Sequence, residues 1–140
     1  MALAILTILG LVLLKCTLNI LYPRQWTMMQ TLTDAYMTYE KSYSQRIDFT
    51  TLTSSSSPWP VMPLNTKTTV EIGRLPGGLP VNGTVIRFRI ADANNLVANG
   101  GTGTAATNPA GMNVWSVQSV LTYNISGRNY YKSRTVIRSQ

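Results

Sequence analysis

The sequence predicts an α+β fold in which one long N-terminal helix carries a small antiparallel β-sheet. Apolar residues and helical spacing fill roughly the first third of the chain. Period-two alternation and turn residues fill the remainder. The 140 residues give room for one ordinary domain. We expect a hydrophobic helix over residues 1–25 and a head over residues 26–140, whose own helix continues to about residue 49.

The first segment reads MALAILTILGLVLL, and nothing in it is more polar than Thr7. As a helix, these residues would cover about 21 Å, which is short of a bilayer core of about 30 Å. Extension to Tyr22 reaches about 33 Å but encloses Lys15. In this chain nothing basic precedes the apolar run and CTLNILYP follows it, which is not the pattern of a secretory signal.

An amphipathic helix is expected to continue beyond Pro23, which is predicted to kink or break the helix. Beyond the proline, large apolar and aromatic residues recur every three or four positions, which predicts one face packed on a sheet. This stripe consists of Trp26, Met29, Leu32, Tyr36, Tyr39, Tyr43 and Ile47.

The β-rich remainder begins after SSSSPWPVMP, residues 54–63, which is predicted to end the helical part. The segments TTVEI (68–72) and TVIRFRI (84–90) alternate with period two and are predicted strands. In the second, Val85, Arg87 and Arg89 should share one face. The segments VWSVQSVLTYNI and NYYKSRTVIR flank Ser126-Gly127-Arg128, which predicts a closing hairpin.

The opening run resembles the N-terminal helix of type IV pilins and of type II secretion pseudopilins. In that family, a basic leader ending in glycine precedes a short segment with a glutamate and then an apolar run close to ALAIL. Residues 2–6 read ALAIL, Gly10 matches the small mid-helix residue, and Pro23 matches the helix-breaking proline, although later than usual. The glycine cleavage site and the glutamate do not occur in this chain. Either they precede Met1 or the chain is a divergent member.

The resemblance implies a structural subunit of a bacterial type IV pilus-like filament at the cell surface. The subunit would be held in the inner membrane until the pilus assembly machinery polymerises many copies through their N-terminal helices. Lys15 is expected to be a buried polar residue between subunits, and no cofactor is expected. The implied membrane helix and filament core consists of Leu3, Ile5, Leu6, Ile8, Leu9, Leu11, Val12, Leu13, Leu14 and Leu18.

Two alternatives stay open alongside the pilus subunit. One is a pseudopilin of a type II secretion system, and the other is a non-polymerising single-span membrane protein with a small β-domain. An enzyme is the least favoured class. The chain has no histidine, one cysteine and five well-separated acids, so no catalytic set or metal site can be assembled from the sequence.

The basic residues of the β-rich part are a further candidate site. The chain has twelve Lys and Arg residues and five Asp and Glu residues. The basic residues of this part could form a solvated sheet face with inter-subunit pairing, or a surface that holds nucleic acid or an anionic polysaccharide without specificity. The residues concerned are Arg87, Arg89, Arg128, Lys132, Arg134 and Arg138. Asn82 and Asn124 stand in the N-x-Ser/Thr pattern of glycosylation acceptors.

Overall fold

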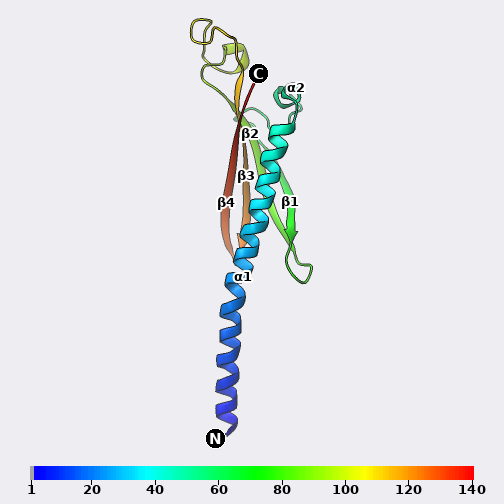
Figure 1. Cartoon of the computed structure of the whole chain (residues 1–140), viewed down its shortest axis with the longest axis vertical. Helices are drawn as coiled ribbons and strands as arrows, with labels where there is room; N and C mark the ends of the chain where they lie inside the picture. Colours follow the sequence, from blue (N-terminus) through cyan, green and yellow to red (C-terminus); the bar gives the residue numbers. More distant parts are fainter. Residues whose placement is uncertain (1) are drawn as a thin grey trace.

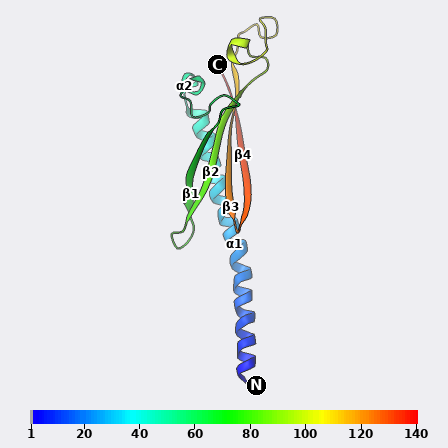
Figure 2. The same cartoon turned by 180° about the vertical axis from the view of Figure 1, so that it is seen from behind.

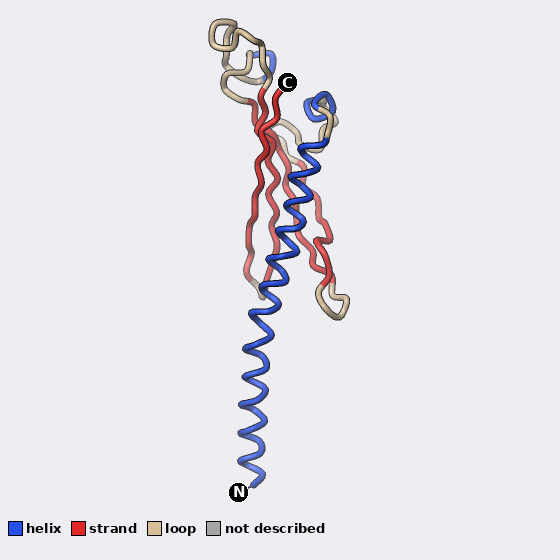
Figure 3. The backbone as a smooth tube through the Cα atoms, in the orientation of Figure 1, coloured by secondary structure: helices blue, strands red, loops and turns tan. Residues whose placement is uncertain are grey.

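The computed structural model describes the backbone of residues 2–140 and the side chains of residues 3–17 and 23–140. The predicted α+β fold is confirmed. A long helix, α1 (Ala2–Arg46), packs with its second half on a four-stranded antiparallel sheet, and its first half projects beyond that sheet (Figure 1). The tube view shows that helix and sheet form one elongated body with the N-terminus at one end and the C-terminus near the other (Figure 3).

Helix α1 runs through Pro23 without interruption, so the expected helix break is wrong. Proline has a helical φ, so the helix can continue through it, at a cost of about 3 kcal/mol for the missing hydrogen bond and the crowding of its ring against the carbonyl four residues earlier. Beyond Pro23, the Thr27 hydroxyl donates to the Pro23 carbonyl over 2.9 Å. A short helix, α2 (Phe49–Thr53), follows, and Asp48 caps it by accepting a hydrogen bond from the Thr50 amide over 3.1 Å.

The sheet contains β1 (Thr66–Arg74), β2 (Pro80–Ala91), β3 (Val114–Ile125) and β4 (Arg128–Ser139), in the order β1-β2-β3-β4. All neighbours are antiparallel, and a one-turn 3-10 helix, η1 (Val97–Asn99), lies in the connection between β2 and β3. The predicted closing hairpin is confirmed, with Ser126 and Gly127 both at positive φ in its turn. That geometry matches the twist of paired strands and favours glycine.

Two apolar clusters join the second half of α1 and the segment after it to one face of the sheet. The first contains Met37 of α1 with Val85, Leu121 and Tyr123. The second contains Leu52, Trp59, Trp115 and Val117. In the view from behind, the sheet lies in front of the second half of α1, so the helix covers the face of the sheet that points away from the viewer (Figure 2).

The buried stripe of α1 differs from the predicted stripe. Trp26 and Tyr39 are 48% and 56% exposed, although the periodicity placed them on the packed face. The fully covered positions are Met29, Thr33, Met37, Glu40 and Ser44. Three of these are polar and have hydrogen-bond partners: Glu40 accepts from Arg87 of the sheet, whereas the Thr33 and Ser44 hydroxyls donate to carbonyls of α1 itself.

Candidate assembly surface

The first half of α1 presents an uncovered apolar surface, which we call the projecting segment, residues 3–17. Nine large apolar side chains are 52–78% exposed there: Leu3, Ile5, Leu6, Ile8, Leu9, Leu11, Val12, Leu13 and Leu14. The segment extends beyond the sheet in both views of the ribbon (Figures 1 and 2). Leu18, which was also predicted to belong to the core, lies outside the described side chains.

The polar groups of the projecting segment are mostly satisfied within the helix. Thr7 donates to the Ala4 carbonyl over 2.9 Å, and Thr17 donates to the Leu13 carbonyl over 2.8 Å. A Cβ added at Gly10 would meet no atom within 4 Å, so another helix backbone can approach closely at this point. Lys15 is the one charged residue of the segment, and it and Cys16 are exposed.

An exposed apolar surface of this kind is unusual for a soluble monomer. Soluble monomers rarely expose contiguous apolar patches of more than a few hundred square ångströms, and larger ones mark protein or membrane contacts. Here the apolar side chains follow one another around the whole circumference of the helix. Over the described residues, no helix combines the length and hydropathy needed to cross a membrane.

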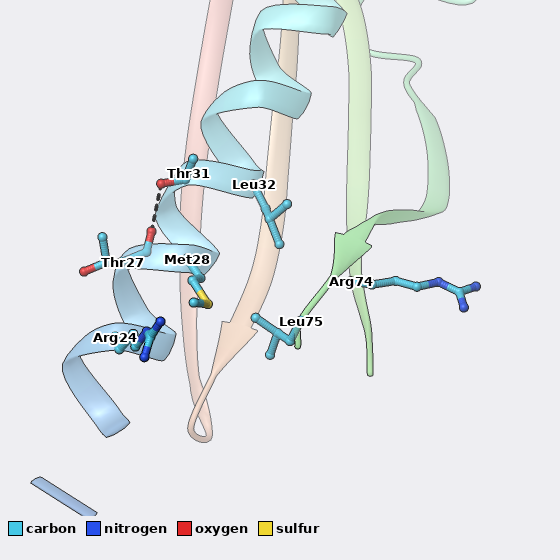
Figure 4. Close-up of a pocket in the computed structure, with 7 residues that line it drawn as sticks. All are labelled: Arg24, Thr27, Met28, Thr31, Leu32, Arg74 and Leu75. Carbon is cyan, nitrogen blue, oxygen red and sulfur yellow. Dashed lines mark hydrogen bonds between the residues drawn. The ribbon is translucent and has the colours of Figure 1, made fainter. Parts of the chain in front are cut away.

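A groove opens where the projecting segment meets the head. It has a volume of about 360 Å³ and is lined by Arg24, Thr27, Met28, Thr31 and Leu32 of α1 and by Arg74 and Leu75. Met28 and Leu32 point toward Leu75, while Arg74 points away from the helix (Figure 4). The guanidinium of Arg74 donates instead to Glu71 over 2.8 Å.

The centre of the interface between α1 and the sheet is a buried ion pair. Glu40 accepts from Nε and Nη2 of Arg87 over 2.8 and 2.6 Å, and its carboxylate also accepts from Tyr36 and Ser119. Burial alone would raise the pKa of Glu40, but the hydrogen bonds and charge of Arg87, with those from Tyr36 and Ser119, outweigh burial and lower it. The same bonds raise the pKa of Arg87.

Two further arginines bind the carboxyl ends of helices. Arg89 is 4% exposed and donates to the carbonyl of Thr53 at the end of α2 over 2.8 Å and to that of Trp59 in the following loop over 2.6 Å. Arg138 donates to the carbonyls of Ser44 and Ile47 at the end of α1 over 2.6 and 3.0 Å. A cation at this end satisfies carbonyls that have no partner in the helix and interacts favourably with the helix dipole.

The predicted basic residues therefore do not form one exposed surface. Lys132 and Arg134 lie near Asp34 of α1, with N–O distances of 2.9 and 3.6 Å. Arg128 is exposed at the start of β4, next to the turn. Arg87, Arg89 and Arg138 contact oxygens of the helical part from the covered face of the sheet, as shown above. Contact with nucleic acid or an anionic polysaccharide stays a prediction, for which Arg128 and Arg134 are the exposed members of the set.

Two acidic partners of these basic residues were not predicted from the sequence. Glu40 pairs with Arg87, and Asp34 pairs with Lys132 and Arg134. The sequence held a signal for these ion pairs, because both acids stand in the amphipathic helix while several basic residues alternate along the strands.

Of the two candidate acceptors of glycans, Asn82 is exposed on β2. The Asn124 side chain is engaged in the β3–β4 turn, where it donates to Asn129 and accepts from the Gly127 amide, both over 3.0 Å.

The chain matches no protein-family model, no curated protein and no solved structure. Its long N-terminal helix packed on a four-stranded antiparallel sheet is nevertheless an architecture like that of pilins.

Proposed function

We propose that this chain is the structural subunit of a type IV pilus-like filament that polymerises through its N-terminal helix. The observation that supports the proposal is the projecting segment, which presents nine exposed apolar side chains in a continuous helix firmly joined to a folded head. Burying one such side chain is worth about 1.5–3 kcal/mol relative to water. An arrangement that covers all of them is therefore strongly favoured.

Packing of copies around a shared axis would cover the segment on every side, as its all-round apolar surface requires. The same ten predicted core residues, Leu18 included, would then lie at the centre of the polymer and the heads on its outside. Residence in the inner membrane before assembly, export to the cell surface and use of a pilus assembly machinery accompany this proposal as expectations from the family resemblance.

The direct test is imaging of fibres sheared from cells that produce the chain. Leu9→Asp places a charge in the middle of the projecting segment, where a packed core offers it no solvent. Fibres should form from the wild-type chain and be lost in this variant. Val97→Asp is the matched control, because Val97 is exposed on the head in η1.

Comparison at equal levels of produced protein separates assembly from expression. Normal fibre yield from Leu9→Asp would contradict a role of the helix in polymerisation. A chain that stays associated with membranes and forms no fibres under any condition would favour the single-span alternative.

A further inference from the structure

The groove at the base of the head continues on the other side of Leu75. A second hollow, also of about 360 Å³, is lined by Arg24, Gln25, Met28, Leu75, Pro76 and Leu79. It shares Arg24, Met28 and Leu75 with the groove of Figure 4. Leu79 is 64% exposed at its margin. Together, the two hollows form what we call the basal groove, a largely apolar depression between α1 and the β1–β2 loop.

The walls of the basal groove are held in place by specific contacts. The loop closes through hydrogen bonds from the Leu75 amide to the Leu79 carbonyl over 2.9 Å and from the Gly78 amide to the Leu75 carbonyl over 3.0 Å. A Cβ at Gly73 would lie 2.8 Å from Leu32 Cδ2, so the glycine leaves room for the Leu32 side chain beside β1. The groove is therefore an element of the fold with defined walls.

We infer that the basal groove receives residues 3–14 of the projecting segment of a second copy, an inference that rests on the proposed function. The groove is apolar, and the projecting segment of the same chain is an uncovered apolar helix of the kind that would fill such a groove in a second copy. The incoming residues carry no charge, so they bring no cation toward Arg24 and Arg74. An apolar helix in an apolar groove is a common mode of recognition in proteins.

Aligning the middles of the two segments gives a register that can be tested. If parallel copies place the middle of residues 3–14 beside the middle of residues 24–32, they are offset by about 19–20 residues, or about 29 Å along the helix. Lys15 of the incoming copy then lies level with Asp34, which is 53% exposed in the side chain and is the acid nearest to that level. Asp34 already pairs with Lys132 and Arg134 of its own chain, so Lys15 would share its carboxylate with these two cations.

This contact is open-ended, because the projecting segment and the basal groove are different surfaces of the same chain. Each copy both inserts a segment and offers a groove. Such heterologous contacts generate filaments when the rotation between copies does not close a ring. Docking in the basal groove would thus set the axial spacing of one family of contacts in the filament.

Disulfide trapping tests the contact in assembled full-length chain carrying Cys16→Ser. One cysteine is placed in turn at Leu11, Val12 or Leu13, so that one faces the groove whatever the rotation of the helix. The second is Thr31→Cys in the groove or Thr38→Cys as the matched control. Both threonines are exposed and each donates to the carbonyl four residues earlier, over 3.0 and 2.8 Å, but only Thr31 lines the groove.

The offset brings Val12 level with residue 31, whereas Thr38 lies about 10 Å further along the helix, beyond the reach of a disulfide. Oxidised fibres should therefore give a ladder of cross-linked multimers with Thr31→Cys and loss of that ladder with Thr38→Cys. Fibres that form normally but cross-link equally with both cysteines, or with neither, would overturn docking in the groove while leaving the proposed function intact. A chain that forms no assemblies would overturn both.

A second pair of variants needs no cross-link. Thr31→Asp puts a carboxylate against the incoming apolar helix, and Thr38→Asp puts the same charge outside the groove. Fibre yield should be lost in the first variant and kept in the second. The near-ultraviolet circular dichroism spectrum checks that the head is folded in both. Equal yields from the two folded variants would contradict the inference.

Discussion

At the scale of single residues, Glu40 decides how the helix meets the sheet. Its carboxylate is fully buried, yet it accepts hydrogen bonds from Arg87, Tyr36 and Ser119. Burial, followed by the charge and hydrogen bond of Glu40, raises the pKa of the Tyr36 phenol above its ordinary value, so Tyr36 remains a hydrogen-bond donor. Removing one partner of such a pair leaves the other charge buried and uncompensated.

Glu40→Gln should therefore lower the free energy of unfolding by about 3–5 kcal/mol, measured by urea unfolding followed by tryptophan fluorescence. Glu71→Gln is the matched control, because Glu71 pairs with Arg74 on the exposed edge of the sheet. It should change the stability little. Equal effects of the two substitutions would show that the buried pair does not hold the helix on the sheet.

The same carboxylate predicts a pH dependence. The pKa of Glu40 is lowered in the folded chain, so its stabilising effect is complete above the pKa of an unfolded glutamate, about 4.3. The stabilisation is lost as the pH falls through the lower pKa of the folded state. Between neutral pH and about pH 3, the wild-type chain should lose more stability than Glu40→Gln. Parallel pH profiles of the two chains would contradict this linkage.

Lys15 is exposed in the single chain, and its expected burial between subunits remains a prediction. Lys15→Met keeps an unbranched apolar stem and removes the charge. If a neighbour's Asp34 is its partner, the variant should give fewer or less stable fibres than the wild-type chain at equal membrane levels. Fibre yield after shearing measures this effect. An unchanged yield would indicate that Lys15 makes no contact needed for assembly.

At the scale of elements, the strands and the closing hairpin could be predicted because alternation and turn residues are local signals. The covered face of α1 could not, because Thr33, Glu40 and Ser44 are polar and yet buried. Helical periodicity counts apolar side chains and gives no weight to a polar residue whose partner lies 47 positions away, as Arg87 does from Glu40. The sequence predicted that Val85, Arg87 and Arg89 share one face of a strand. It did not predict that the helix covers this face.

The arginines at helix ends give a prediction at this scale. Arg138→Met should free the carbonyls of Ser44 and Ile47 and loosen the last turn of α1, with a loss of about 1–3 kcal/mol for charge-assisted hydrogen bonds. Hydrogen exchange of amides near residues 43–47 should become faster. Arg128→Met, at the exposed start of β4, should leave these amides unchanged. Similar exchange in both variants would argue against capping by Arg138.

At the scale of the whole molecule, the head and the projecting segment have separate tasks. The two apolar clusters lie entirely in the head, so removal of residues 1–25 should leave a folded and monomeric domain. Sedimentation measures its mass, and circular dichroism measures its folding. If this fragment is unfolded while the full chain is folded, the sheet depends on contacts within the polymer.

Helical reconstruction of the fibres by electron cryo-microscopy tests most directly whether the projecting segment is the element of assembly. The account predicts that residues 3–17 of many copies form a helical core at the fibre axis, with the four-stranded sheets outside it. A fibre whose axis is formed by the sheets, with the projecting segments at its periphery, would contradict it.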